Sequence, residues 1–391
     1  MTETDCDVVI LGAGVGGTFL ATLLARAGLS VLVLGRQPDF PAKGAEFLKP
    51  RGLQVLDRHG ILPDVEQRGA LRRTSIEYYH DGSLLQVLDF ESGGPPGHYL
   101  IVPYREILAA ICAAGNGRVE YRFGTSVAAM DSGDHEVERI RLDDGGTVRA
   151  RIVVGADGGS SAAHTYIGAP VARYDFDHVM RATLIPLTDG VCESNRLYFG
   201  STGWFAYLYP LTGTQARVFV AAPTAQDPGD RIAPELLSGF VSRSDDALAL
   251  IGEAVFERAP VSACLATRYH RDNVVVLGSA AFNVHPMTGL GMSYTLEDAE
   301  ILADVITAAL QRGESLPNLL AARYVPRRSA HRDLLAYGNR LASSYRSPQE
   351  YRHAFDPSRH GADKLFRSAT APPPGVGVSW VQDRSVSEPA L

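Results

Sequence analysis

The sequence predicts an α/β protein, in which a parallel-sheet domain is interleaved with a mainly antiparallel sheet and followed by a helical region. Three apolar, strand-like runs each end in a glycine cluster, at 7–17, 151–161 and 273–281. Helical spacing and a second strand at 30–34 follow the first cluster, which makes a βαβ unit. Uninterrupted apolar strands are typical of parallel sheets that are buried on both faces. Alternating strand patterns over 170–267 indicate the antiparallel part.

The first glycine cluster reads Gly12-x-Gly14-x-x-Gly17 and lies between a predicted strand and a predicted helix. In that context the motif predicts a dinucleotide site. Gly12 would permit the tight turn, Gly14 the approach of a pyrophosphate, and Gly17 close packing of helix on strand. The helix N-terminus would then face the phosphates with free N–H groups and a partial positive charge. An ordinary strand–turn–helix corner is the alternative.

The acidic residue that normally ends the second strand of such a site is missing. The strand ends in Gly35 and Arg36, where an Asp or Glu would bind the adenosine ribose. Loss of one charge-assisted hydrogen bond costs about 1.5–3 kcal/mol. Arg36 could instead stack on adenine or pair with a phosphate, and a solvated surface arginine is the alternative.

The remaining elements follow from the spacing of apolar residues. Alternation predicts strands at 75–79, 84–90, 119–123, 126–130, 137–142, 179–186, 196–199, 204–209 and 216–221. Asp81-Gly82 is a typical two-residue hairpin turn between the first two of these strands. Helical spacing predicts helices that end near 60, open at 104, cover 296–310 and lie within 316–345. The Pro/Gly/Ser-rich segment 372–391 is predicted to be a flexible tail.

Composition excludes several classes of function. The formal net charge of −7 argues against binding to a nucleic-acid backbone. The four cysteines are scattered without metal-ligand spacing, so we expect no metal site and reduced thiols in a cytoplasmic protein. The acidic N-terminal residues lead directly into the first strand and predict no signal peptide. No apolar run approaches the ~20 residues that a membrane span needs.

Several motifs in sequence order resemble one family. They are Gly12-x-Gly14-x-x-Gly17, Gly44-x-Glu46-x-Leu48-x-Pro50-x-Gly52, Arg105-x-x-Leu108, Gly155-Ala156-Asp157-Gly158 and His285-Pro286-x-x-Gly289-x-Gly291-Met292. From Asp7 to about Tyr345, the chain resembles the FAD-dependent aromatic-ring hydroxylases, the single-component flavoprotein monooxygenases related to para-hydroxybenzoate hydroxylase.

The resemblance implies a domain plan. A discontinuous, Rossmann-like FAD domain would comprise 1–74, 101–169 and 268–312. The other predicted parts are a substrate-binding sheet at 75–100 and 170–267, helices at 313–371 and the tail at 372–391.

The resemblance also implies the cofactor site. Arg105 would reach the flavin side chain and phosphates, and Val127 would touch adenine through its backbone. Asp157-Gly158 would lie near the pyrophosphate, and the segment 286–292 beneath the flavin pyrimidine, where N–H groups stabilise the charge of the reduced ring. The predicted cofactor-binding residues are Gly12, Gly14, Gly17, Arg36, Glu46, Arg105, Val127, Asp157, Gly158, Ser279, Pro286, Gly289, Gly291 and Met292.

The chain departs from the family pattern at several cofactor positions. Gly278-Ser279 stands where the family has Gly-Asp, Phe282 where a histidine is common, and His164 where an arginine is common. Together with Gly35, both carboxylates that hold FAD hydroxyls are absent. Two independent losses would cost about 3–5 kcal/mol, which weakens a nanomolar FAD site to micromolar.

The function that the resemblance implies is an FAD-dependent monooxygenase. NADPH or NADH would act as a transient reductant without a domain of its own. O₂ would react at the flavin, and a C4a-hydroperoxide would hydroxylate or epoxidise a flat, electron-rich small molecule. An aromatic or polycyclic secondary metabolite, as in antibiotic biosynthesis, fits this chemistry. The alternatives are a non-redox step (cyclisation, dehydration or rearrangement) and an accessory binding role.

Four residues are candidate substrate contacts: Tyr207, Tyr209, Phe282 and His285. The two tyrosines lie in an aromatic-rich stretch that could cover a flat, apolar ligand. A plain sheet core explains the aromatic residues equally well, and His285 could simply hold the turn before Pro286. The sequence names no catalytic acid or base.

Overall fold

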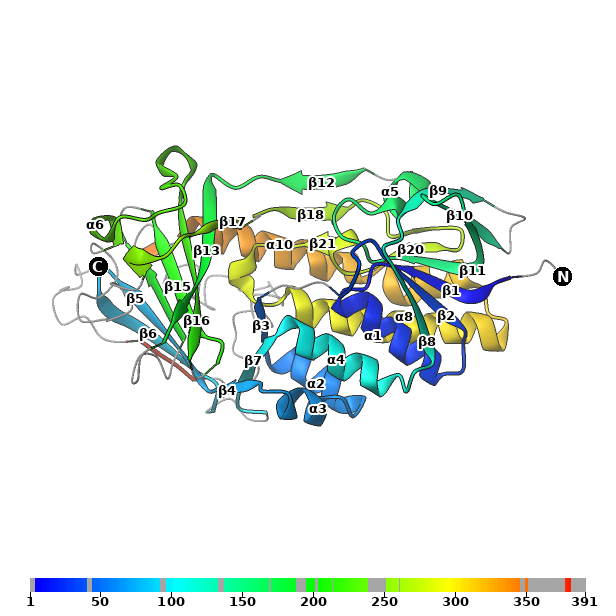
Figure 1. Cartoon of the computed structure of the whole chain (residues 1–391), viewed down its shortest axis with the longest axis horizontal. Helices are drawn as coiled ribbons and strands as arrows, with labels where there is room; N and C mark the ends of the chain where they lie inside the picture. The colour runs from blue at the N-terminus through cyan, green and yellow to red at the C-terminus, as the bar shows by residue number, and fades with distance from the viewer. Residues whose placement is uncertain are drawn as a thin grey trace, which may run out of the picture. The chain divides into compact units, whose positions relative to one another are not determined.

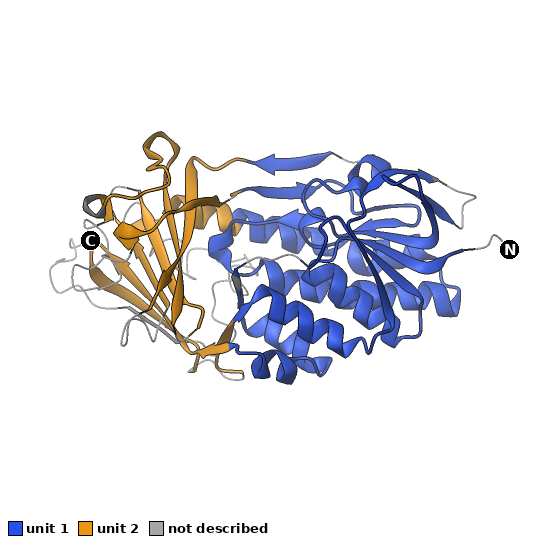
Figure 2. Ribbon diagram, viewed as in Figure 1, with its two compact units in different colours: residues 1–70, 102–174, 262–336 blue, residues 71–101, 175–261, 337–391 orange. Residues whose placement is uncertain are grey.

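The structure is a computed structural model that describes residues 4–40, 44–91, 96–132, 137–168, 170–187, 195–200, 203–212, 214–237, 251–259, 261–344, 349–350 and 377–380. The chain forms two compact units (Figure 2). The first comprises residues 1–70, 102–174 and 262–336, and the second comprises 71–101, 175–261 and 337–391. The segment 313–371, which the sequence analysis treats as a separate helical region, is therefore divided between the two units.

The first unit is built on an eight-stranded sheet in the order β19-β20-β11-β1-β2-β8, with β10 added beside β11 and β9 beside β10. Its parallel strands are β1 (Cys6–Leu11), β2 (Val31–Gly35), β8 (Val119–Phe123), β11 (Thr147–Gly155) and β20 (Val274–Val276). Its antiparallel strands are β9 (Val127–Ser132), β10 (Glu138–Leu142) and β19 (His270–Arg271). The central pair Val9 and Val153 is fully buried, which confirms the prediction of a parallel sheet covered on both faces.

The helices of the first unit begin with α1, which packs against both α4 and α8 (Figure 1). They are α1 (Val15–Arg26), α2 (Pro50–Arg58), α3 (Leu62–Gln67), α4 (Tyr104–Ala114), α5 (Ala162–Ile167), α8 (Gly291–Arg312), α9 (Leu316–Leu319), the π-helical turn η5 (Leu320–Tyr324) and α10 (Arg327–Ser344), which continues into the second unit. The helices predicted from apolar spacing are confirmed, whereas the short helices α3 and α5 have no counterpart among the predictions.

Short elements connect the motifs of the first unit. They are β3 (Ala45–Leu48), β12 (Val171–Tyr174), β18 (Ala263–Ala266) and β21 (Phe282–Asn283), with the 3₁₀ turns η3 (Gly278–Ala280) and η4 (Pro286–Thr288). Strands β12, β18 and β21 form a small antiparallel sheet. The two 3₁₀ turns lie in the third glycine region, so that region is a folded corner between β20 and α8.

The second unit contains an eight-stranded sheet in the order β17-β13-β16-β15-β14-β5-β6-β22. The strands are β5 (Ser75–His80), β6 (Ser83–Asp89), β13 (His178–Pro186), β14 (Asn195–Phe199), β15 (Phe205–Pro210), β16 (Gln215–Pro223), β17 (Glu257–Ala259) and β22 (Gly377–Trp380). Beside it lie β4 (Leu71–Arg73), paired with β7 (Tyr99–Pro103), and the short helices η2 (Thr224–Gln226) and α6 (Pro234–Leu237). Asp81 (φ 45°) and Gly82 (φ 77°) make the predicted hairpin turn, since both need positive φ.

Strand β22 corrects one expectation. The sequence predicts a flexible tail from residue 372, but Gly377 to Trp380 pair with Asp89 to Gln86 of β6 in an antiparallel ladder. The ladder satisfies backbone groups of an otherwise open sheet edge, which is a physical reason for the tail to order there. The other tail residues lie outside the described part of the chain.

Candidate cofactor and substrate sites

The first and second glycine corners touch each other. Gly12 has a φ of +109°, and a Cβ on it would lie 2.5 Å from the carbonyl oxygen of Ala156 and 2.8 Å from the Cα of Asp157. The Ala156 N–H donates to the carbonyl of Leu11 at 2.7 Å. Only glycine fits at this position, because both its backbone angle and the adjacent backbone exclude a side chain.

The third corner joins the other two. The Leu277 N–H donates to the Gly155 carbonyl at 2.8 Å, which links the third strand end to the second. A Cβ on Gly16 would lie 2.5 Å from Cγ2 of Thr295 on α8, and one on Gly278 would lie 3.1 Å from the same methyl group. The three glycine regions therefore converge within one compact unit.

Two helices begin at this convergence: α1, with Gly14 as its N-cap residue, and α8, with Leu290 as its N-cap residue. In neither helix does the side chain of the N-cap residue accept a backbone N–H, and neither has an acidic residue in its first turn. The first helical hydrogen bond of α8 runs from the Tyr294 N–H to the Leu290 carbonyl, so the three preceding N–H groups have no intrahelical acceptor. In α1, the Val15 N–H donates to the hydroxyl of Tyr104 at 3.1 Å. Both ends suit an anionic ligand, which is the chemistry that FAD brings.

The other predicted cofactor residues lie in the same unit. Arg105, in the first turn of α4, forms an exposed ion pair with Asp39 at 3.0 Å. Asp157 is exposed, and its Oδ2 accepts the Ala162 N–H at 3.2 Å. Ser279 is exposed in η3. The remaining ones are exposed or half-buried: Arg36, Glu46, Val127, Gly158, Pro286, Gly289, Gly291 and Met292.

Aromatic residues fill the place of the missing acid on β2. A Cβ on Gly35 would lie 2.7 Å from Cδ1 of Phe123. The Phe123 ring packs against Phe40, with centroids 4.9 Å apart, and stacks with Tyr121 at 5.9 Å. Gly35 is therefore required by packing, and a carboxylate at this position would need Phe123 to move. No sequence pattern indicates this cluster, because its members come from separate segments.

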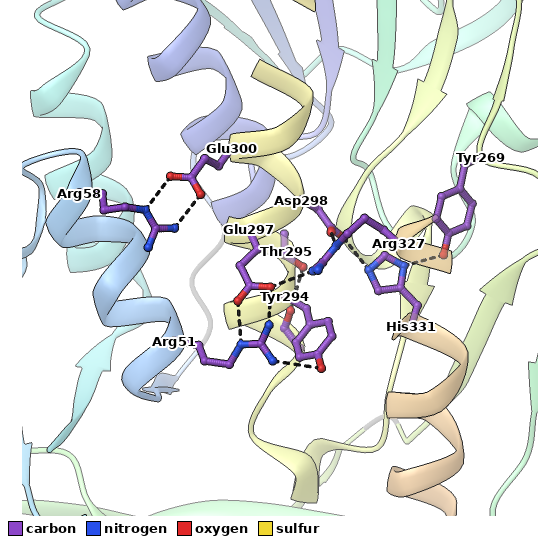
Figure 3. Close-up of polar contacts among 11 residues, drawn as sticks. Arg51, Arg58, Tyr269, Tyr294, Thr295, Glu297, Asp298, Glu300, Arg327 and His331 are labelled. Carbon is purple, nitrogen blue, oxygen red and sulfur yellow. Dashed lines mark hydrogen bonds and ion pairs between the residues drawn. The ribbon is translucent and has the colours of Figure 1, made fainter. Parts of the chain in front are cut away.

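Two cations of α2 pair with acids of α8 (Figure 3). Arg51 binds Glu297 through two hydrogen bonds of 2.7 and 2.8 Å, and its guanidinium lies 4.7 Å from the centroid of the Tyr294 ring. Arg58 makes the same bidentate contact with Glu300, through hydrogen bonds of 3.1 and 2.7 Å. Paired arginines of this geometry hold the two helices in register.

A buried polar chain follows on the other side of α8 (Figure 3). Asp298 is fully buried, 2.6 Å from Nε of Arg327 and 2.8 Å from Nε2 of His331. The neighbouring carboxylates raise the pKa of Arg327, so the guanidinium stays charged. Nδ1 of His331 lies 2.6 Å from the Tyr269 hydroxyl, and its ring stacks on Phe282 at 3.8 Å. Phe282 is 2 % exposed, so the structure shows it packed inside this unit.

The loop before α8 holds two more side chains. His285 is fully buried and its Nδ1 accepts the Met287 N–H at 3.2 Å, which caps the turn η4. Lys49, immediately before α2, donates from Nζ to the carbonyl of Thr288 at 2.8 Å. Burial lowers the pKa of the Lys49 ammonium from 10.5 to about 8. Lys49 is not among the residues predicted for the site, and its only sequence signal is its position inside the 44–52 motif.

The second unit presents aromatic residues on one face of its sheet. The opposite face forms the apolar core cluster, which includes Tyr198, Leu208 and Val218. Because side chains alternate along strands, Tyr207 and Tyr209 face away from that core, with ring centroids 5.1 Å apart. Leu197 and Phe219 lie on the same face, because each pairs with Tyr207 across a neighbouring strand. Arg217 also lies there, with its guanidinium 4.7 Å from the centroid of the Phe219 ring. Burial, with neighbouring tyrosines, raises the pKa of Tyr207 well above its usual value, so its phenol stays protonated.

Comparison with known proteins identifies the family. The model of the "FAD binding domain" family matches residues 5–336, which include all three glycine corners. The chain belongs to the FAD-dependent monooxygenases. PqsL of Pseudomonas aeruginosa, in complex with 2-aminobenzoylacetate, is 34% identical, with a TM-score of 0.83 over 90% of this chain and 99% of that one. This monooxygenase family has FAD as its cofactor, and none of the comparisons supports the non-redox alternative.

Two curated relatives show the range of the family. Pentachlorophenol 4-monooxygenase of Sphingobium chlorophenolicum is 25% identical over 85% of this chain, which spans 64% of that protein. Aklavinone 12-hydroxylase DnrF of Streptomyces peucetius is 26% identical over 88% of this chain and 76% of its own length.

Among the residues that the structure describes, no helix is long and apolar enough for a membrane span, and no cluster of three metal-ligating side chains occurs.

Proposed function

We propose that this monooxygenase uses NADH or NADPH, FAD and O₂ to hydroxylate a small aromatic compound with an acidic side chain, of the 2-aminobenzoylacetate type. The convergence of the three glycine corners on the N-termini of α1 and α8 carries the FAD part of the proposal. The substrate class rests on the likeness to PqsL, at 34% identity over 90% of this chain.

The first unit would bind and orient the cofactor. The N-terminus of α1 would receive the pyrophosphate beside Gly12 and Gly14, where a side chain would block its approach. Arg105 could exchange its exposed partner Asp39 for a phosphate, because exposed ion pairs are weak. The N–H groups at the start of α8 would face the flavin pyrimidine. When bound, FAD supplies the redox chemistry and the activation of O₂.

The aromatic face of the second unit would contact the substrate. Tyr207 and Tyr209 offer apolar rings with a phenol at the edge, which suits a flat aromatic ligand. The raised pKa of Tyr207 keeps its hydroxyl available as a hydrogen-bond donor. Arg217, a cation stacked on Phe219, would complement the acidic group of the substrate. His285 and Phe282 stay predictions as substrate contacts.

The test is turnover by the full chain reconstituted with excess FAD. With 2-aminobenzoylacetate present, NADH or NADPH oxidation and O₂ uptake should rise. Mass spectrometry should show a product that has gained one oxygen atom from isotopically labelled O₂. Binding of FAD without substrate-dependent O₂ uptake, across 2-aminobenzoylacetate and related aromatic acids and phenols, would refute the proposed activity.

A further inference from the structure

The cations between α2 and α8 are balanced by acids with one exception. Arg51 pairs with Glu297, and Arg58 pairs with Glu300. Lys49 precedes Arg51 by two residues, and among the described residues it makes no ion pair. Its single hydrogen bond, 2.8 Å long, goes to a neutral backbone carbonyl.

The Lys49 ammonium is therefore an uncompensated charge. An ammonium has three N–H donors, and the carbonyl of Thr288 accepts one of them. Desolvation is the cause of the lowered pKa of Lys49, and no neighbouring carboxylate opposes it. A partly desolvated charge of this kind destabilises a protein unless an anion joins it. The position of the charge thus points to an anion that comes from outside the chain.

The position of Lys49 suggests which anion. Gly289 follows Thr288 with a φ of +55°, and a Cβ on it would lie 3.0 Å from Cε and 3.3 Å from Nζ of Lys49. Leu290 and α8 follow directly, with the free N–H groups of the first turn. Two sources of positive potential, the half-buried Lys49 ammonium and the N-terminus of a helix of 22 residues, therefore lie beside one short loop.

We propose that the Lys49 ammonium pairs with the isoalloxazine ring of FAD in its reduced, anionic state and so favours reduction of the bound flavin. The inference rests on the proposed function, because it requires bound FAD. Transfer of a hydride from NADH or NADPH adds two electrons and one proton to a neutral ring, which then carries one negative charge. A fixed cation stabilises that charged state more than the neutral one. We favour the flavin over a substrate carboxylate because the Lys49 ammonium contacts the loop that leads into the N-terminus of α8, at the carbonyl of Thr288, and the two cationic features reinforce each other there.

The experiment compares Lys49→Met with the wild type, both reconstituted with FAD, and measures the reduction potential of the bound flavin spectroscopically. Methionine keeps most of the length of the side chain and removes the charge. We expect the reduction equilibrium of bound FAD to fall by about tenfold, which is ~30 mV for a two-electron couple. Lys49→Arg should keep most of the wild-type potential. Arg58→Met, which removes a cation already paired with Glu300, should leave the potential unchanged.

A second measurement separates this function from a structural one. If Lys49 only tethered the loop through Thr288, its loss would lower the melting temperature of the flavin-free protein. Removal of an uncompensated, half-buried charge should leave that temperature equal or higher.

An unchanged reduction potential of the bound flavin in Lys49→Met would overturn the inference. If that variant also lost affinity for 2-aminobenzoylacetate, Lys49 would instead bind the substrate. A wild type that binds no FAD would refute the proposed function and the inference together.

Discussion

Contact between the first and third glycine corners can be tested by substituting Gly16 and Thr295. Gly16 is in the first turn of α1, and a Cβ there would lie 2.5 Å from Cγ2 of Thr295 on α8. Thr295 cannot turn away easily, because it is β-branched and its Oγ1 donates to the carbonyl of Gly291 at 2.9 Å. Gly16→Ala should therefore push the two helices apart at the predicted cofactor site.

The expected magnitude follows from opposing effects. Overpacking of a core contact costs about 1–3 kcal/mol, and alanine in place of glycine in a helix returns up to about 1 kcal/mol. Thr295→Ser removes the clashing methyl group and costs about 1 kcal/mol or less, because this side chain is half-buried. In the double variant the clash is absent, while the introduced serine keeps a hydroxyl that can donate to the Gly291 carbonyl. The double variant should thus be about 1–3 kcal/mol more stable than the sum of the single changes predicts.

The assay is urea unfolding of the flavin-free protein for the wild type, both single variants and the double variant, with FAD titration of each. We expect Gly16→Ala to weaken FAD binding and the second change to restore part of it. Additivity of the unfolding free energies within about 0.5 kcal/mol would show that the two residues do not touch. The convergence of the corners would then be refuted at that contact.

Three further predictions concern single positions. The pKa of Lys49 is about 8 in the folded protein and 10.5 in the unfolded chain. Below pH 8 the ammonium is charged in both states, so its desolvation lowers the free energy of unfolding by the full amount. The unfolding free energy of the flavin-free wild type should therefore rise relative to Lys49→Met by up to about 3 kcal/mol as pH increases from 8 to 10.5, and equal pH profiles would contradict this. Ser279→Asp should tighten FAD about tenfold in titrations by adding a charged hydrogen-bond acceptor at an exposed position, while Ser315→Asp, an exposed control at the N-cap of α9, should have no effect. Asp298→Ala should lower the unfolding free energy by about 3–5 kcal/mol, because it removes a fully buried carboxylate and leaves half-buried Arg327 without its 2.6 Å partner. A loss below about 1 kcal/mol would show that Glu297 alone compensates the guanidinium.

Much of the fold could be predicted because its signals are local. Val9 and Val153 lie in uninterrupted apolar runs, and such runs predict buried parallel strands without knowledge of their neighbours. Asp81-Gly82 predicts its hairpin because the turn itself requires two residues with positive φ. Strand β22 was missed, since its four residues pair with β6, nearly three hundred positions earlier, and carry no strong pattern of their own.

The site was predicted only in part, for the same reason. Glycines that admit phosphates can be recognised from spacing, but their contacts cannot. The sequence shows that Gly35 replaces an acid, yet only the structure shows Phe123 where the side chain of that acid would begin. Restoring a glutamate at position 35 is thus a poor test of FAD affinity, whereas Ser279 is exposed and accepts substitution.

By itself, the sequence determined most of the turns, strands and helices of this chain, and that a dinucleotide site of the FAD type is present. These properties depend on the conformational freedom of the backbone and on the spacing of apolar residues. Both are decided by residues that are close together in the sequence. The tertiary structure decided which side chains meet: Thr295 against Gly16, the aromatic rings against Gly35, and Lys49 against a carbonyl 239 residues away. Contacts of that separation depend on how whole elements pack, and no local pattern encodes them.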